Sequence, residues 1–237
     1  TYMVTVNDVN GCTASHTAVI TQSSSITASL SVVPVNCFGQ STGIINMAVA
    51  GGVLPYTFNW SDGATQQNRN GVIAGTYTVT ITDFSGCTLA ESAVVSENTQ
   101  IILNGNVTNI ACAGLNTGAI TLTVSGGSPS YSYNWGGGVT SQNRTGLAAG
   151  NYSVTVTDNA LCTVSATYTV TQSANLIVNL SATPASCFGG NDGVVSSLVS
   201  GGVAPYTYNW NNAATTSSIN NLTIGSYQVT VTDNAGC

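Results

Sequence analysis

Apolar and hydroxyl residues alternate along three segments of the chain, each opening with Gly-x-Tyr and closing with Thr-Asp. These segments span residues 75–83, 150–158 and 225–233. Successive side chains of a β-strand point to opposite faces of a sheet, so the alternation predicts strands with one buried face. In the first segment we expect Tyr77, Val79 and Ile81 to face a core and the threonines between them to face water.

Two further patterns predict strands. Three segments of aliphatic and small residues each end at a Gly-Gly pair, where a strand stops and the chain turns: 43–50, 118–125 and 193–200. Three aromatic residues at a spacing of two follow each pair: Tyr56, Phe58 and Trp60, then Tyr131, Tyr133 and Trp135, then Tyr206, Tyr208 and Trp210. This spacing places three rings on one strand face, which fits a buried core better than a platform for sugar rings. The predicted core centres on Trp60, Trp135, Trp210, Tyr77, Tyr152 and Tyr227.

All of these patterns recur at one constant interval, and the cysteines follow the same period with short and long gaps in strict alternation. The cysteines are Cys12, Cys37, Cys87, Cys112, Cys162, Cys187 and Cys237. A fixed period of this kind indicates tandem structural repeats. No segment shows a helical period, so we predict an all-β fold of immunoglobulin-like sandwiches, each with about seven short strands. We expect the sandwiches to follow one another in a linear rod.

The 75-residue repeat divides the chain into four parts. Residues 1–24 are expected to be the C-terminal part of a truncated repeat. Two immunoglobulin-like repeats follow at 25–98 and 99–173, and residues 174–237 form a further repeat that lacks its last strand. Both ends of the chain are therefore expected to lie inside a repeat.

Charge is scarce, because only 4% of residues are charged, with two lysines and arginines in total and a net charge of -6. No basic surface can neutralise phosphates, which excludes nucleic acid as a partner. No apolar run is long enough to span a bilayer, so we expect no direct membrane insertion. Evenly spaced cysteines in small units favour disulfides in an oxidising, extracellular compartment. One histidine cannot supply repeated zinc sites, and we expect no cofactor.

Three blocks recur in a fixed order: Cys-Phe-Gly-x-x-x-Gly, Gly-Gly-x-x-Pro-Tyr-x-x-x-Trp and Gly-x-Tyr-x-Val-Thr-x-Thr-Asp-x-x-Gly-Cys. The combination resembles the SprB-type repeats of large cell-surface adhesins in the phylum Bacteroidetes. The residues that carry it are Cys37, Phe38, Gly39, Gly43, Gly51, Gly52, Pro55, Tyr56, Trp60, Gly75, Tyr77, Asp83, Gly86 and Cys87. The middle unit departs from it at Ala113, Ser130 and Leu161. The resemblance implies an exported filamentous surface protein that acts in attachment and gliding motility and is delivered by the type IX secretion system.

The period of the cysteines allows three disulfide pairings. The pairing we prefer joins cysteines across each short gap, because two strands around a turn bring their open ends together: Cys12 with Cys37, Cys87 with Cys112, and Cys162 with Cys187. A second pairing joins cysteines across each long gap, such as Cys37 and Cys87, but those sites lie at opposite ends of an immunoglobulin-like sandwich. A third pairing links adjacent repeats end to end through Cys37 with Cys162 and Cys112 with Cys237.

His16 is the only side chain that could act as a base near neutral pH. Its equivalents in the next two repeats are Glu91 and Ala166, so the period supplies no catalytic partners in fixed geometry. The chain also contains no Gly-x-Ser-x-Gly elbow and no paired-carboxylate motif. We therefore expect no enzyme activity and interpret His16 as an exposed strand residue.

Four aspartates recur at the period: Asp8, Asp83, Asp158 and Asp233. A calcium ion needs six to eight oxygen ligands, usually with several carboxylates, and each unit has very few acidic residues. We therefore expect the aspartates to cap hairpin turns. Arg69 and Arg144 occupy matching positions, which Ile219 takes in the third unit, and we expect the arginines at the surface.

These observations favour a structural shaft: a section of a long extracellular adhesin filament on the bacterial cell surface, with neighbouring repeats of the same chain as its partners. One alternative is an array of modules that bind a glycan or a surface by avidity, with surface polysaccharide as the partner. Another is a self-assembling extracellular sheath or filament subunit, because a low charge permits lateral packing with other subunits.

Overall fold

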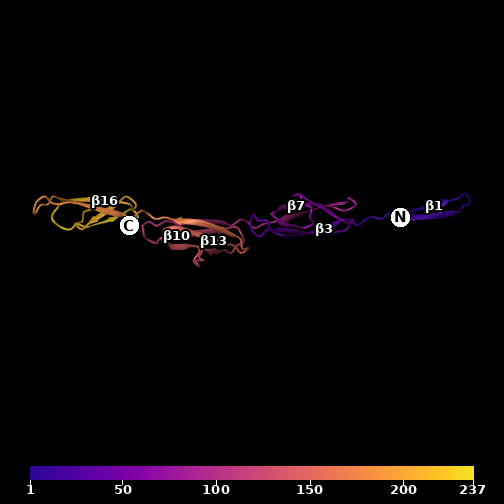
Figure 1. Ribbon diagram of the computed structural model, residues 1–237, viewed down its shortest axis with the longest axis horizontal. Coiled ribbons are helices and arrows are strands. Elements are labelled where there is room, and N and C mark those ends of the chain that lie inside the picture. The colour runs from indigo at the N-terminus through magenta and orange to yellow at the C-terminus, as the bar shows by residue number, and fades with distance from the viewer. The chain divides into compact units, whose positions relative to one another are not determined.

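The computed structural model describes residues 1–237 and confirms an all-β fold (Figure 1). The chain divides into two compact units, residues 1–100 and residues 101–237, and each is described by itself. The structure holds no helix with the length and apolar character needed to cross a membrane.

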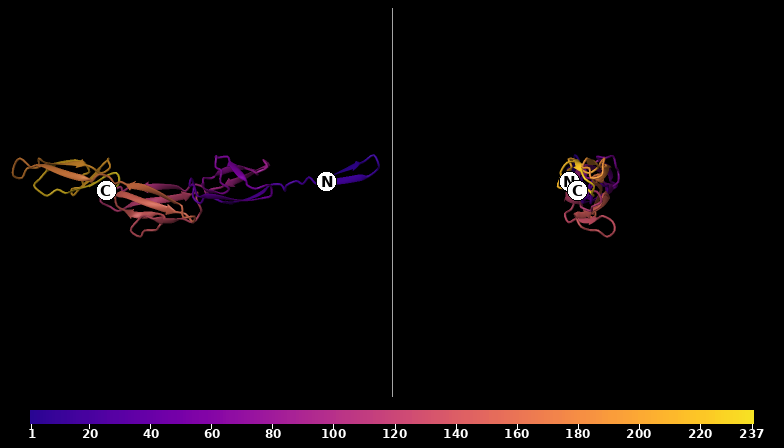
Figure 2. Two further views of the ribbon diagram at one scale, coloured as in Figure 1. Left: turned by 45° about the vertical axis from the view of Figure 1, so that its right-hand side comes forward. Right: turned by 90° about the vertical axis from the view of Figure 1, so that its left-hand side faces the viewer.

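The first unit starts with a hairpin of two strands, β1 (Tyr2–Asn7) and β2 (Thr13–Ala18), which form a sheet of their own. Every residue of this hairpin is exposed, and Figure 2 shows no second layer over it. Six strands follow in the first repeat: β3 (Thr27–Val33), β4 (Gly43–Ala50), β5 (Thr57–Trp60), β6 (Arg69–Val72), β7 (Gly75–Thr82) and β8 (Thr88–Val95). They form two antiparallel sheets, with the orders β3-β4-β6 and β5-β7-β8.

The second unit contains two further repeats of this pattern. The second repeat has β9 (Ile102–Thr108), β10 (Gly118–Ser125), β11 (Ser132–Asn134), β12 (Arg144–Leu147), β13 (Gly150–Thr157) and β14 (Thr163–Val170). The third repeat has β15 (Ile177–Thr183), β16 (Gly193–Ser200), β17 (Thr207–Trp210), β18 (Ser218–Leu222) and β19 (Val229–Thr232). The sheets of the second repeat are β12-β10-β9 and β11-β13-β14, and those of the third are β15-β16-β18 and β17-β19.

The strand order within a complete repeat is of the immunoglobulin type. The first, second and fourth strands form one sheet, and the third, fifth and sixth form the other, which corresponds to an A-B-E sheet and a C-F-G sheet. Each complete repeat has six strands, one fewer than the count of about seven expected from the sequence, and residues 61–68 form turns and bends. The chain turns there through two backbone hydrogen bonds, from Trp60 N–H to Ala64 O (3.0 Å) and from Gly63 N–H to Trp60 O (2.9 Å).

The core of each complete repeat lies between its two sheets. In the first repeat Val79 and Ile81 of β7 pack with Ile45 of β4 and with Trp60 of β5. The indole N–H of Trp60 donates to Gln66 O at 2.8 Å, so the ring is buried with its polar atom satisfied. The equivalent Trp135 and Trp210 are buried and bonded in the same way, to Ser141 O and Thr216 O.

The tyrosine of each alternating strand forms a tyrosine corner. The Tyr77 hydroxyl donates to Ile73 O, four residues upstream, at 3.1 Å. Tyr152 and Tyr227 make the same bond to Ala148 O at 2.9 Å and to Thr223 O at 3.0 Å. A bond of this kind fixes the turn that leads into the fifth strand of the repeat, as it does in immunoglobulin-like domains.

Candidate functional site at the ends of the repeats

The aspartate that follows the fifth strand of a repeat joins two loops. In the second repeat, Oδ1 of Asp158 accepts the N–H groups of Ala160 and Cys162, both at 2.9 Å, and so caps its own turn. Oδ2 accepts the N–H of Ser128 at 2.8 Å, from the loop that follows β10. A carboxylate that binds backbone N–H groups of both loops holds them together at one end of the sandwich.

Asp83 and Asp233 do the same in the other two repeats. Oδ2 of Asp83 accepts Val53 N–H at 3.0 Å, and Oδ2 of Asp233 accepts Val203 N–H at 2.8 Å. Their Oδ1 atoms accept the N–H groups of Cys87 and Cys237, at 2.8 and 2.9 Å. Asp8, in the isolated hairpin, caps its turn through Asn10 and Cys12 alone and stays exposed.

These contacts lower the pKa of the three buried carboxyls. For Asp83 and Asp158, burial raises the pKa, but the N–H groups of Val53 and Ser128 and of the two turns lower it by more. For Asp233, the N–H groups of Cys237 and Val203 lower the pKa, and burial opposes them. Each carboxylate therefore remains ionised within its loops at neutral pH.

The second glycine of each Gly-Gly pair makes room for this carboxylate. A Cβ on Gly127 would lie 2.6 Å from Oδ2 of Asp158, and one on Gly202 would lie 2.7 Å from Oδ2 of Asp233. From the sequence the pair indicates only a turn, and this close approach of glycine to carboxylate is not visible there. The signal that could have revealed it is the recurrence of the aspartate and the glycine pair in every unit.

A disulfide joins the second and third repeats. Cys112, in the loop between β9 and β10, is bonded to Cys237, which follows β19, and their Cα atoms are 5.5 Å apart. The separation of 125 residues is that of the third pairing considered above, which links adjacent repeats. Cys237 also belongs to the turn that Asp233 caps, so the cross-link is attached to a hydrogen-bonded turn.

The preferred pairing across the short gaps is wrong at all three gaps, because Cys112 is bonded to Cys237 and the expected disulfide candidates Cys12, Cys87 and Cys187 are free thiols. It assumed that β8 and β9 form a hairpin that brings Cys87 and Cys112 together. In the structure β8 pairs with β7 and β9 pairs with β10, so the two strands belong to different repeats. Cys12, Cys87 and Cys187 are exposed thiols, and Cys37 and Cys162 are disulfide-bonded.

The segment between the second and third repeats is hydrogen-bonded to both. Ser173 donates its N–H to Ile110 O at 3.2 Å and its hydroxyl to Ala111 O at 2.5 Å, next to Cys112. Gly202 of the third repeat donates its N–H to Ala174 O at 3.0 Å. The linker therefore has few degrees of freedom even without the disulfide.

The sequence suggested that the two arginines lie at the surface, but in the structure both side chains are partly buried. The Arg69 side chain is only 15% exposed, and its guanidinium lies 5.7 Å from the Trp60 ring centre and forms an ion pair with Asp62. Arg144 lies 5.7 Å from the Trp135 ring centre and 5.3 Å from that of Tyr152. Each arginine covers the edge of the core by cation–π contact.

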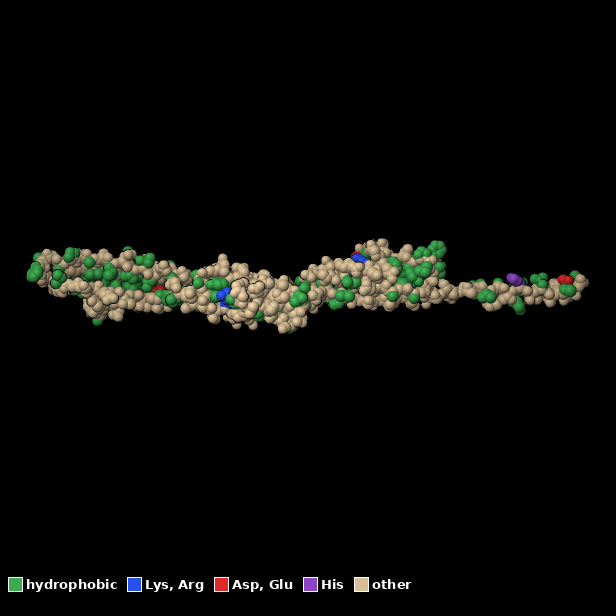
Figure 3. Space-filling view, turned by 60° about the horizontal axis from the view of Figure 1, so that its bottom comes forward, with side chains coloured by type: hydrophobic (Ala, Val, Ile, Leu, Met, Phe, Trp, Pro, Cys, Tyr) green, Lys and Arg blue, Asp and Glu red, His purple; other side chains and the backbone are tan.

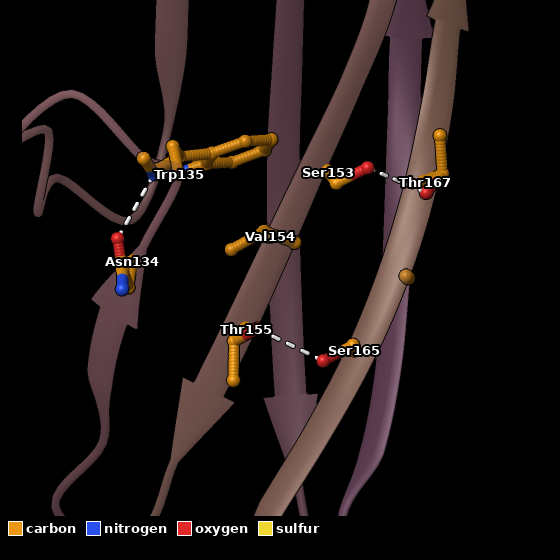
Figure 4. Close-up of a pocket in the computed structure, with 9 residues that line it drawn as sticks. Asn134, Trp135, Ser153, Val154, Thr155, Ser165 and Thr167 are labelled. Atoms are coloured by element: carbon orange, nitrogen blue, oxygen red, sulfur yellow. Dashed lines mark hydrogen bonds between the residues drawn. The ribbon is translucent and has the colours of Figure 1, made fainter.

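A shallow groove of about 560 Å³ lies on the β11-β13-β14 sheet of the second repeat (Figure 4). Hydroxyls line it in cross-strand pairs: Ser153 with Thr167 at 2.7 Å, and Thr155 with Ser165 at 2.9 Å. Because these hydroxyls already bond to one another, they reinforce the sheet. The groove contains no acid, base or thiol among its lining residues.

His16 lies on β2, where it is exposed and pairs in register with Val4 of β1. The structure places no carboxylate or nucleophile in hydrogen-bond contact with it. The ionised and reactive groups of the chain therefore gather at the ends of its repeats, in the aspartate turns and at the cysteines.

Three segments of the chain match the family model described as the SprB repeat: residues 29–65, 104–140 and 179–215. The chain contains three SprB repeats. Each matched segment runs from the first strand of a repeat past its buried tryptophan, and the three matches follow one another at the period of the sequence. Because it contains SprB repeats with this fold, the chain is a structural repeat region of the adhesin type.

Several solved structures of tandem immunoglobulin domains are similar to this chain. A three-domain titin fragment, I67-I69 in an E-to-A mutated variant, is 14% identical, with a TM-score of 0.38, over 89% of this chain and 94% of that one. The N-terminal eight domains of the Down syndrome cell adhesion molecule are 13% identical, with a TM-score of 0.40, over 88% of this chain and 35% of that one. Among curated proteins, none matches this chain in sequence.

Proposed function

We propose that the chain is a section of the shaft of a long extracellular adhesin filament, exported through the type IX secretion system and used for surface attachment and gliding motility. The SprB repeats support the placement on the bacterial cell surface. The shaft transmits force and sets reach, and the proposal assigns it no catalytic role.

The observation that carries this proposal is the disulfide between Cys112 and Cys237, which joins consecutive repeats. A cross-link inside one repeat would stabilise that repeat alone. A cross-link between repeats instead carries the force through the disulfide when the chain is pulled. The force then bypasses the 125 residues that separate the two cysteines. Ser173 and Ala174 add hydrogen bonds to both neighbours, so the linker resists bending as well as extension.

Single-molecule stretching between the two ends of the chain tests whether the disulfide bears force in the proposed shaft. Complete unfolding of the reduced chain should give a contour length at least about 430 Å greater than that of the oxidised chain, because each released residue adds about 3.5 Å. Cys12→Ser is the matched control, since Cys12 is an exposed thiol, and it should leave both lengths unchanged. Equal lengths before and after reduction would show that the disulfide does not bear the load.

Cells whose filaments carry different numbers of repeats provide a test of the proposed role in attachment and gliding. Filaments seen by electron microscopy should lengthen by about 35 to 45 Å for each added repeat, the length of a strand plus its turns. Attachment and gliding speed should fall when the filament is shortened. A filament length that does not depend on repeat number would contradict the shaft function.

An array of glycan-binding modules is the second candidate, and the hydroxyl-lined groove near Trp135 favours it. The pairing of those hydroxyls with one another weakens it, because a sugar would have to break existing hydrogen bonds. Binding of the whole chain to a glycan array, abolished by Ser153→Ala with Thr155→Ala, would support this candidate over the shaft.

A further inference from the structure

The loop that carries Cys112 is held by the end of its own repeat. We call the clamp the contact between residues 109–114 of this loop and residues 171–173, which follow β14. Its centre is a parallel bridge between Ile110 and Gln172. The N–H of Ile110 donates to a backbone carbonyl of the second segment at 2.8 Å. Ile110 is only 2% exposed, so the bridge also anchors the loop in the core.

Two side chains extend the clamp to either side of Cys112. Gln172 accepts the N–H of Gly114, two residues after the cysteine, at 3.1 Å. Ser173 donates its hydroxyl to Ala111 O, directly before the cysteine, at 2.5 Å. The backbone on both sides of Cys112 is therefore bonded to the segment that leads into the third repeat.

The first repeat has the same clamp, made by different side chains. A parallel bridge at Glu97 again lies at its centre. The Glu97 carboxylate accepts the N–H of Gly39 at 2.6 Å, and the Asn98 side chain donates to Asn36 O at 2.7 Å. Cys37, the cysteine of this loop, is disulfide-bonded. Because Glu and Gln make the same bond in the two repeats, the clamp requires a side-chain oxygen at this position and no charge.

The partner of Cys112 is also held by hydrogen bonds. The Cys237 N–H donates to Asp233 Oδ1 at 2.9 Å, and its sulfur lies 3.5 Å from Ala111 O, inside the clamp. The two Cα atoms are 5.5 Å apart, a separation that a disulfide spans without moving the backbone. Both sulfurs therefore meet on fixed backbones, which gives groups that must react together a high effective concentration.

The chain offers Cys112 other partners. Cys87 and Cys187 are exposed thiols, and both lie closer to it along the sequence than Cys237, which is 125 residues away. In an unfolded chain the shorter loops close more readily. Charge gives little guidance, because only 4% of residues are charged, and Figure 3 shows charged side chains only at scattered points of the face in view. The position of the folded loop must therefore select the partner.

We propose that the clamp selects Cys237 as the partner of Cys112, with Gln172 as its positioning residue. Residues 171–173 follow the last strand of the second repeat, so the clamp forms only when that strand is in place. The loop then presents Cys112 to the third repeat and not to thiols that are nearer in sequence. The disulfide accordingly follows the folding of the second repeat. This inference does not depend on the shaft function.

The oxidation needs an external oxidant, for which glutathione disulfide serves in the test. One of the two cysteine thiolates attacks a sulfur of glutathione disulfide, which releases one glutathione and leaves a mixed disulfide. The other thiolate then attacks the protein sulfur of the mixed disulfide and releases the second glutathione. Two thiol protons pass to the two glutathione thiolates, and two electrons reduce the oxidant. The clamp acts in the second step, because it holds the loop of one sulfur beside the other.

Oxidative refolding of the reduced, urea-unfolded chain tests the selection. Gln172→Ala should form the Cys112–Cys237 disulfide about fivefold more slowly than wild type, since it removes one hydrogen bond of the clamp. Cys112 should then also appear in pairs with Cys87 or Cys187. Acid stops thiol exchange at chosen times, and peptides from a pepsin digest, separated without reductant, identify each pair. A wild-type rate and pattern of pairing in Gln172→Ala would overturn the proposal.

Two variants separate positioning from a general loss of stability. Gln142→Ala is the matched control, because Gln142 is also exposed and its side chain also makes one bond to the backbone of this repeat, to Leu122 O at 2.7 Å. It should pair its cysteines like wild type. Gln172→Glu should restore the wild-type rate, since Glu97 makes this bond in the first repeat. Slowing by Gln142→Ala equal to that by Gln172→Ala, or no rescue by glutamate, would count against a positioning role.

Amide hydrogen exchange tests whether the clamp precedes the disulfide. In a Cys237→Ser chain, which cannot form this bond, the N–H groups of Ile110 and Gly114 should still exchange slowly, because the clamp lies within the second repeat. Adding Gln172→Ala should speed exchange at Gly114 and leave it unchanged at Trp135, whose N–H is bonded to a turn outside the clamp. If Gly114 in the Cys237→Ser chain exchanged as fast as an unbonded loop amide, the disulfide would be making the clamp, and the proposed order would be wrong.

Discussion

Asp8 and Asp158 occupy the same position of the sequence repeat but have different surroundings. Each accepts the N–H groups two and four residues later, at 2.9 and 2.7 Å for Asp8 and at 2.9 Å for both in Asp158. Asp158 also accepts Ser128 N–H, from 30 residues earlier, and is 3% exposed, whereas Asp8 is exposed. The capped turn is therefore a local structure, and the burial of its carboxylate requires a complete repeat.

Replacing each of the two aspartates by alanine should give the largest difference in unfolding free energy between the two sites. Asp158→Ala removes the acceptor of three backbone N–H groups in a buried site and should lower the free energy of unfolding of the second repeat by about 3 kcal/mol. Asp8→Ala should leave the unfolding of the second repeat unchanged. Urea denaturation followed by Trp135 fluorescence measures this, in a background where Phe replaces Trp60 and Trp210. Similar losses from both variants would show that the loop-to-loop bond contributes little.

Alanine at two glycines sharpens the comparison. Gly127 and Gly11 both have positive φ, +64° and +86°, so alanine adds about 1 to 2 kcal/mol of backbone strain at either site. A Cβ on Gly127 also meets Asp158 Oδ2 at 2.6 Å and an Ile101 carbon at 2.7 Å, whereas one on Gly11 meets nothing within 4 Å. We expect Gly127→Ala to lower stability by about 2 kcal/mol more than Gly11→Ala, measured by thermal unfolding. Equal losses of stability in the two variants would mean that Gly127 is needed only for the conformation of its turn.

Acid should weaken the complete repeats through their buried aspartates. The pKa values of Asp83, Asp158 and Asp233 are lowered in the folded chain, relative to about 3.9 for an unfolded aspartate. Their stabilising contribution is therefore present above about pH 4 and is lost as the pH falls through the unfolded and then the folded pKa. Urea midpoints should decline below about pH 4, and Asp158→Asn should flatten the decline reported by Trp135. A midpoint of wild type that does not change with pH would contradict this assignment.

The arginine position should give the smallest effect. Arg144 covers Trp135 and Tyr152, while the matching Ile219 of the third repeat is buried in its core. Arg144→Ala should cost about 1 kcal/mol, since it removes both the cation–π contact and the cover that the side chain provides. Arg144→Ile should stay within about 0.5 kcal/mol of wild type. A loss with isoleucine as large as the loss with alanine would show that the charge, not the cover, matters here.

Strands and turns could be predicted from the sequence because their signals are local. The alternation in residues 75–83 predicted β7, and Tyr77, Val79 and Ile81 are buried as that pattern requires. The Gly-Gly pairs predicted the ends of β4, β10 and β16, and both glycines of the first pair have positive φ. Each complete repeat has six strands where about seven were expected, and residues 61–68, between β5 and β6, form turns and bends.

Cysteine pairing could not be predicted from the sequence because every candidate pairing obeyed the same period. Distance along the chain favoured a local bond for Cys112, but its partner Cys237 is 125 residues away. The bond depends on which loops meet where one repeat follows another. The cover that Arg144 gives to the core was missed for a similar reason, since its position on a strand does not show which ring it meets.

The sequence by itself determined the repeat period, the alternating strands, the capped aspartate turns and the aromatic residues of the core, because each depends on neighbours a few positions apart or on simple recurrence. Only the tertiary structure decided that the Asp158 carboxylate would be buried against the Ser128 loop and that Cys112 would join the next repeat. These features arise where segments separated by 30 to 125 residues come together, and the folded sheets alone set those distances.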